Sequence, residues 1–255
     1  MKEYRHIKYR RIRVWAIILI ILLISISRSS SAPTRQFLGF KPGKESSRLP
    51  EGWEVITYFR TNENRISLTK EGARTILKMK SLGSASAVLK RIQVDPKAFP
   101  WLVWCWKIDR VVGMAIESRK ERNDSSARIR VIFEKKAGKP FRSYPRILKF
   151  LSNLNLPISG SEPSGFKIDY IWGNDIPRGK VIDYPDSENH KIVIVKNGNK
   201  KANQWVWEKR NLIKDFQKFF GEQPLNLIGI VVLTDTDQTN EGVTAHYSSI
   251  VLTNQ

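Results

Sequence analysis

The chain has 255 residues, a formal net charge of +20 and a single cysteine. One cysteine excludes an intramolecular disulfide. The Lys and Arg residues form many short clusters and no single block typical of a nucleic-acid-binding tail, so nucleic acid is not expected as a partner. The first thirteen residues hold six Lys or Arg and one acid, a net of +5, which leaves +15 for the rest. Such an excess indicates an anionic neighbour, such as lipid head groups or an acidic glycan, or a solvated basic surface without a dedicated partner.

The N-terminus has the charge and hydropathy pattern of an export signal. Residues 1–13 are basic, residues 14–27 are mainly apolar, and residues 28–49 form a linker rich in Pro, Gly and Ser. The apolar segment is shorter than the roughly 17–25 residues of a spanning helix, so a signal-anchor and a cleaved signal peptide both fit it. The positive-inside rule then leaves residues 1–13 in the cytoplasm. We therefore expect the body, residues 50–255, to be anchored to the inner membrane and lie in the periplasm, or to be exported. Three apolar residues of the linker are expected to dock on the body or on the bilayer surface: Phe37, Leu38 and Phe40.

Strand patterns dominate the body. Trp101–Ile108 is apolar on both strand faces, which predicts a central strand between two layers, and Leu225–Thr234 predicts a second. Arg128 and Arg130 alternate with apolar residues, which predicts a strand with one wet face. The spacing of the candidate strands is typical of a β-sandwich of roughly ten strands. The other candidates are Trp53–Arg60, Arg65–Thr69, Arg74–Lys80, Ala87–Ile92, Phe166–Trp172, Lys191–Lys196, Gln204–Lys209 and Thr244–Leu252.

One short helix is predicted over residues 211–220. Its apolar residues recur at helical spacing and include Phe216 and Phe219, which we expect to face inward. Asn211 can cap the start of this helix and Gly221 can end it.

These elements resemble a bacterial family known only as domain of unknown function 3047, over roughly residues 50–253. The resemblance implies an exported protein with a mainly β fold, a jelly-roll-like β-sandwich akin to carbohydrate-binding modules, and it implies no established activity. The stretches that carry it are Trp104–Lys107, Asn123–Phe133, Asp169–Gly173, Ile192–Gly198, Trp207–Gly221 and Leu233–Thr239.

The loop after the second central strand is a candidate metal site. Asp235 and Asp237 have the same parity, and with Thr239 they offer the oxygen ligands that Ca²⁺ prefers. An Asx-turn, a Lys or Arg from the basic surplus, or a set of backbone amides could satisfy the same carboxylates. No other cofactor is expected.

Aromatic and charged residues near strand ends are candidates for ligand binding. Trp53 and Trp172 are expected to be exposed, whereas most of the eight tryptophans are expected in the core. Glu208 and Arg210 could line a polar pocket, or Glu208 could form a buried ion pair with Arg128 or Arg130.

The favoured functional hypothesis is a membrane-tethered, non-catalytic module that binds a glycan or another component of the cell envelope, with no catalytic residue. One alternative is an extracytoplasmic hydrolase acting on glycans, which would use Glu208 with Asp235 or Asp237 as acid and base. The other alternative is a scaffold for envelope assembly.

Overall fold

The computed structural model describes residues 34–40, 49–72, 74–136, 161–185 and 187–255. The expected cytoplasmic and hydrophobic segments at the N-terminus lie outside these residues. In the described part of the chain, no helix has the length and apolar content needed to cross a membrane.

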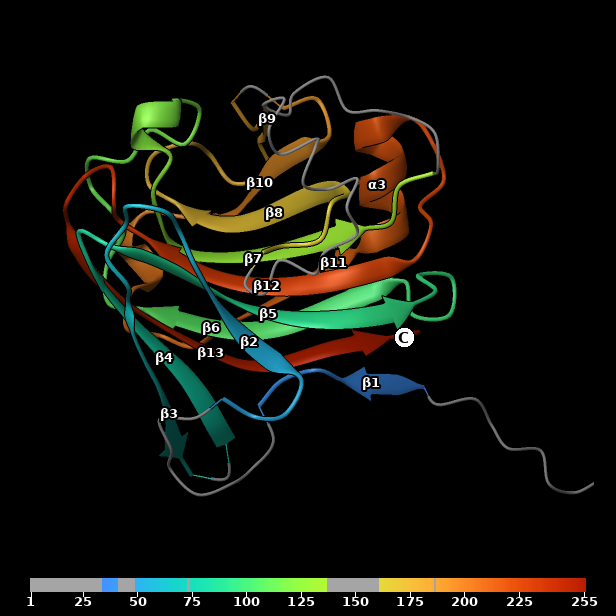
Figure 1. Ribbon diagram of the computed structural model, residues 1–255, viewed down its shortest axis with the longest axis horizontal. Helices are drawn as coiled ribbons and strands as arrows, with labels where there is room; N and C mark the ends of the chain where they lie inside the picture. The colour runs from blue at the N-terminus through green and yellow to red at the C-terminus, as the bar shows by residue number, and fades with distance from the viewer. Residues whose placement is uncertain (1–33, 41–48, 73, 137–160, 186) are drawn as a thin grey trace, which may run out of the picture. The chain divides into compact units, whose positions relative to one another are not determined.

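The described residues form thirteen strands in two sheets, which Figure 1 shows stacked as a sandwich. The only parallel pair among the described strands is β8 with β10. The six-stranded sheet has the order β11–β6–β13–β4–β3, with β1 beside β13; its strands are β11 (Val206–Asn211), β6 (Trp101–Ile108), β13 (Gly242–Thr253), β4 (Arg74–Leu82), β3 (Arg65–Glu71) and β1 (Arg35–Phe37). The seven-stranded sheet has the order β2–β5–β12–β7–β8–β10–β9; its strands are β2 (Trp53–Thr57), β5 (Ala85–Val94), β12 (Leu227–Asp235), β7 (Ser125–Phe133), β8 (Phe166–Gly173), β10 (His190–Asn197) and β9 (Val181–Asp183).

The core lies between the inner faces of the two sheets, where alternate residues of each strand meet. From the six-stranded sheet, Trp104 and Trp106 of β6 are completely buried. Their rings lie 5.4 Å from Tyr170 and 5.9 Å from Trp172 of β8, in the opposite sheet. The predicted sandwich is confirmed, and aromatic side chains fill its centre.

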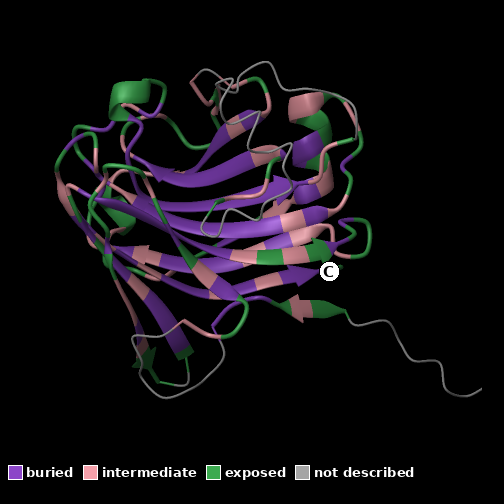
Figure 2. Ribbon diagram, in the orientation of Figure 1, coloured by how far each residue is buried: buried purple, intermediate pink, exposed green. Residues whose placement is uncertain are grey.

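The two strands predicted to be central differ in their outer faces. β12 is buried on both faces, as predicted, and Figure 2 shows it among the buried strands of its sheet. The prediction that β6 is buried on both faces is wrong, because Trp101, Val103 and Lys107 on its outer face are only partly buried. The outer face of β6 is therefore partly exposed to solvent, and on this face only Cys105 is completely buried.

The prediction of a wet face for β7 is also wrong, since all nine residues of the strand are buried. Arg128 is 2% exposed and Arg130 is 7% exposed. Both side chains lie on the outer face of the seven-stranded sheet, where acidic partners replace the water that the alternation had suggested.

The predicted helix is α3 (Leu212–Phe220), and both of its predicted caps are present. Asn211 accepts a hydrogen bond from the Lys214 amide, and Gly221 takes the left-handed conformation with φ of 70°. The Phe216 ring is buried 4.7 Å from Phe133, at the end of β7, and Phe219 packs partly buried against the core. The helix thus covers one end of the sandwich, as Figure 1 shows.

The sandwich begins earlier than the predicted boundary at residue 50. β1 pairs with β13, and the following residues Leu38 and Phe40 are 1% and 2% exposed. Phe40 packs against Trp53, with ring centroids 5.0 Å apart. Of the two expected docking surfaces, the body receives Leu38 and Phe40, whereas Phe37 remains 49% exposed.

Candidate functional site

The outer face of the six-stranded sheet carries the most exposed tryptophan among the described residues. Trp207 of β11 is 53% exposed and pairs in register with Cys105 of β6, so both point away from the core. Lys209 pairs with Val103, and Lys107 pairs with His246 of β13 on the same face. We call this surface the tryptophan–lysine face; its members are Trp101, Trp205, Trp207, Lys78, Lys80, Lys107, Lys209, Arg65, Arg74, Glu71 and His246.

Two of its tryptophans carry a lysine over the ring. The Lys107 ammonium lies 4.8 Å from the centre of Trp205, and the Lys209 ammonium lies 4.5 Å from the centre of Trp101. Trp207 lies between these two pairs in the strand register. Because a strand rises about 3.3 Å per residue, the three rings extend over roughly 20 Å along β6.

The face is strongly basic. Six of the members named above are Lys or Arg, and Glu71 is its one acid. Glu71 accepts a hydrogen bond from Trp205 Nε1 at 3.0 Å, which is the main cause of its lowered pKa, and it lies 3.5 Å from Lys107. Burial, together with Lys107 and Lys78, lowers the pKa of His246. Its Nδ1 atom is buried and has no partner among the described residues.

The expected exposure of Trp53 and Trp172 is wrong. Trp53 is 7% exposed, with the Lys90 ammonium 5.5 Å from its ring, and Trp172 is 1% exposed and donates to the Gly198 carbonyl at 3.0 Å. Both rings are core residues and offer no surface on which a ligand could stack. Position near a loop did not identify the exposed ring, because the strand register decides which way a side chain points.

Glu208 and Arg210 lie on the inner side of the edge strand β11 and have separate partners. Glu208 is 6% exposed and contacts Arg178 at 3.4 Å, so the alternative of an ion pair with Arg128 or Arg130 is wrong. Burial raises the pKa of Glu208, although the positive charge of Arg178 lowers it in part. Arg210 donates twice to Asp215, at 2.8 and 2.6 Å, which ties α3 to β11.

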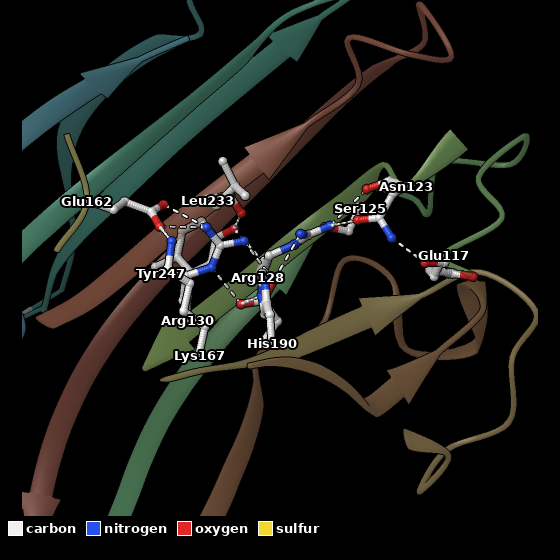
Figure 3. A network of polar contacts seen from close by, with 11 residues as sticks. Glu117, Asn123, Ser125, Arg128, Arg130, Glu162, Lys167, His190, Leu233 and Tyr247 are labelled. Carbon is white, nitrogen blue, oxygen red and sulfur yellow. Dashed lines mark hydrogen bonds and ion pairs between the residues drawn. The ribbon is translucent and has the colours of Figure 1, made fainter. Parts of the chain in front are cut away.

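The true partners of the two arginines of β7 form a buried network on the outer face of the seven-stranded sheet (Figure 3). Asp169 of β8 accepts from Arg128 at 3.0 Å and from Arg130 at 2.7 and 2.9 Å. Arg130 also donates to both carboxylate oxygens of Glu162, which lies 2.6 Å from Lys167. The donors of Arg128 are used by Asp169, the Ser125 hydroxyl and Asn123. The arginines and carboxylates of this network are paired with one another, which indicates a structural role.

The network sets the ionisation of its members. Burial is the largest single influence and would raise the pKa of Asp169 and Glu162, but the nearby cations together outweigh it: Arg130, His190 and Arg128 at Asp169, and Arg130 and Lys167 at Glu162. The pKa of Asp169 therefore lies well below its usual range, and that of Glu162 is about 2. Burial lowers the pKa of His190 to about 4, although Asp169 raises it in part. His190 Nε2 lies 3.0 Å from Asp169 Oδ1, and its ring stacks on Tyr184 at 4.1 Å.

The candidate metal loop brings together the two predicted aspartates and one more. Carboxylate oxygens of Asp124, Asp235 and Asp237 lie within 4.8 Å of one another. Asp124 directly precedes β7, whose Ser125 pairs with Asp235 at the end of β12. The Asx-turn alternative has one contact, from the Asp237 amide to Asp235 Oδ1 at 3.4 Å. Burial raises the pKa of Asp235 well above its usual range, with Asp237 and Asp124 acting in the same direction.

Sequence reasoning missed Asp124 as a site residue and the exposure of Trp207. Asp124 lies in the stretch Asn123–Phe133 that carries the family resemblance, but only the pairing of β7 with β12 places it beside Asp235. The available signal for Trp207 was that it shares its strand face with Trp205 and Lys209, and a lysine on a strand face indicates contact with solvent.

The architecture is that of a jelly-roll-like β-sandwich, with two facing sheets that are antiparallel apart from the pair β8–β10. Within this class, the chain belongs to the family described as protein of unknown function (DUF3047), whose model matches residues 51–251. The resemblance drawn from the sequence is thereby confirmed.

Solved structures similar to this chain share little sequence with it. A family 11 carbohydrate-binding module of a cellulosomal cellulase of Clostridium thermocellum has 11% identity and a TM-score of 0.40, over 88% of this chain and 97% of that one. The xyloglucanase domain of a type three effector from Sinorhizobium fredii, in complex with cellobiose, has 9% identity and a TM-score of 0.43, over 86% and 98%. These values carry no information on ligand or activity. Comparison with curated proteins finds no match.

Proposed function

We propose that this protein is a non-catalytic module that binds an acidic glycan through the tryptophan–lysine face. The observation that carries the proposal is the position of Trp207, which is 53% exposed between two tryptophans that each carry a lysine. The C–H faces of sugar rings stack on exposed indole rings, and ammonium groups beside the rings attract carboxylate or sulfate groups.

The charge of the face favours an acidic glycan over a neutral one. Lys78, Lys80, Lys107 and Lys209 surround the aromatic row, and Glu71 is engaged by Trp205 and Lys107. An anionic sugar would gain attraction from several cations without meeting a free acid. We propose also that the N-terminal segment tethers the protein to the inner membrane, or directs its export, so that the face meets envelope or extracellular glycans.

An array of neutral and acidic glycans, probed with the full-length chain, tests the proposed ligand. Trp207→Ala should lower the affinity at least tenfold, and Trp207→Phe should retain part of it. Phe59→Ala removes an aromatic ring that is 88% exposed in the β2–β3 loop, outside the face, and should change nothing. Binding that survives Trp207→Ala, or no binding to any glycan, contradicts the proposal. Release of shortened products would instead support the glycan-hydrolase alternative.

The location has its own test. A reporter that is active only in the cytoplasm is fused after residue 33, ahead of the described body. Low activity is expected, and strong activity would contradict export.

A further inference from the structure

Three carboxylates meet where β7 begins and β12 ends. Asp124 comes from one segment, and Asp235 and Asp237 come from the other, with ligand oxygens within 4.8 Å of one another. Asp124 is completely buried. Carboxylates this close repel one another unless positive charge or protons lie among them.

The described cations do not supply that charge by direct contact. Arg128 acts on Asp235 through space, but its hydrogen bonds go to Asp169, Ser125 and Asn123. Among the described residues, no Lys or Arg forms an ion pair within 4.0 Å of the three aspartates. The alternative of an internal cation is therefore not favoured.

Backbone amides satisfy part of the cluster. The amides of Thr239 and Gln238 donate to the two oxygens of Asp124, at 2.7 and 3.4 Å. The turn is closed by the Asn240 amide, which donates to the Thr236 carbonyl at 2.9 Å. These contacts hold the turn around Asp124, and the Thr61 hydroxyl donates to Asp237 Oδ2 at 3.3 Å.

Two buried oxygens at the cluster have no partner in the described part of the chain: Asp237 Oδ1 and the Thr239 hydroxyl. Thr239 is only 8% exposed. The Thr239 hydroxyl belongs to the residue whose amide binds Asp124 at 2.7 Å, which places it close to the three carboxylates. An unpaired buried oxygen destabilises the fold, and a cation that takes these oxygens as ligands would remove this cost.

We infer that Asp124, Asp235 and Asp237, with the Thr239 hydroxyl, bind one Ca²⁺ ion. Ca²⁺ takes oxygen ligands at about 2.3–2.6 Å, so two oxygens on one ion are at most about 5 Å apart, and the carboxylate oxygens of the three aspartates, all within 4.8 Å of one another, meet this limit. Mg²⁺ binds at about 2.0–2.1 Å and demands near-ideal octahedral geometry, whereas Ca²⁺ accepts the less regular set of ligands that two separate segments offer here. The bound ion ties the start of β7 to the end of β12 and to the turn that follows it.

The site is independent of the tryptophan–lysine face, which lies on the other sheet. Calcium binding would therefore stabilise the fold without contributing a ligand contact to the proposed glycan surface. The two proposals can succeed or fail separately.

The test uses the full-length chain, treated with chelator and then titrated with Ca²⁺ by isothermal titration calorimetry. One ion per chain is expected, with weaker binding of Mg²⁺. A hundredfold excess over the dissociation constant should raise the melting temperature by about 5–10 °C. Asp124→Asn and Asp237→Asn should abolish the shift, whereas Asp183→Asn, an exposed position in the same sheet, should retain it.

Wild-type protein that binds no Ca²⁺ at millimolar concentration overturns the inference, whether or not the variants fold. A thermal shift of equal size in Asp237→Asn overturns it as well. A variant that fails to fold is replaced by Thr239→Val, which keeps the shape of the side chain and should weaken Ca²⁺ binding measurably.

Discussion

Arg130 of β7 and Asp169 of β8 form a two-point ion pair across the strands, with Nε 2.7 Å from Oδ1 and Nη2 2.9 Å from Oδ2. Neither side chain is more than 8% exposed. Removing two charges from water costs free energy. The attraction between the two side chains offsets this cost only while both hydrogen bonds are kept.

Replacing Asp169 by Asn should therefore lower the free energy of unfolding by about 3–5 kcal/mol, because buried Arg128 loses its acidic partner and buried Arg130 keeps only Glu162. Chemical denaturation of the purified protein measures this change. The matched control is Asp183→Asn, since Asp183 pairs with Lys191 in the same sheet but is 72% exposed. Its effect should be within about 1 kcal/mol of zero. Equal effects of the two substitutions would show that the buried pair has no special role.

His190 should make stability depend on pH. Its pKa is about 4 in the folded protein and 6.5 when unperturbed, so the unfolded chain takes up a proton that the folded chain excludes. The contribution to stability is complete above pH 6.5 and is lost progressively as the pH falls from 6.5 towards 4. The loss is on the order of 3 kcal/mol.

Denaturation midpoints measured between pH 4.5 and 7 for wild type and His190→Gln test this dependence. The variant should have a flatter profile in this window, whatever its stability at pH 7. Below about pH 4.5, protonation of Glu162 and Asp169 should destabilise both proteins in the same way, because their folded-state pKa values are lowered. Parallel profiles above pH 4.5 would exclude His190 as the titrating group.

Two tryptophans of adjacent strands should separate stability from binding. Trp104→Ala removes a completely buried ring and should cost about 3–5 kcal/mol. Trp207→Ala removes a ring that is 53% exposed and should cost less than about 1 kcal/mol. Thermal and chemical denaturation give both values. A large loss for Trp207 would mean that its ring acts mainly in packing, and would weaken its proposed role in binding.

The hydrogen bond at the N-cap of α3 can be tested by a single substitution. Asn211→Ala removes the acceptor for the Lys214 amide, 2.9 Å away, and should cost about 1 kcal/mol of stability. Asn211→Asp keeps an acceptor at the same place and should remain close to wild type. If Ala and Asp variants unfold at the same denaturant concentration, the cap contributes nothing measurable.

Much of the fold could be predicted because its signals are local. Strand alternation located the predicted strands, and the apolar spacing around Phe216 located α3 with both caps. The two short strands β1 and β9 carry too few residues for a periodic signal, and pairing with β13 and β10 defines them.

The sites were harder to predict because they depend on which strands pair. The alternation of Arg128 and Arg130 looks the same whether water or Asp169 faces it, and Asp169 lies far away in the sequence. Asp124 joins Asp235 only through the pairing of β7 with β12. The exposure of Trp207 likewise follows from its position on β11, the edge strand beside β6. The sequence of one strand does not reveal which other strand will pair with it.

The pairing of β1 with β13 places the two ends of the described body side by side, with Arg35 opposite Thr253. A short peptide could therefore join the last residue to the first of this unit without stretching the chain. Circular permutation should be compatible with the fold, with new ends opened at an exposed position such as Gly72 between β3 and β4, where an added Cβ would meet no atom within 4 Å. The same two sheets should therefore form even when the strands follow one another in a different order along the chain.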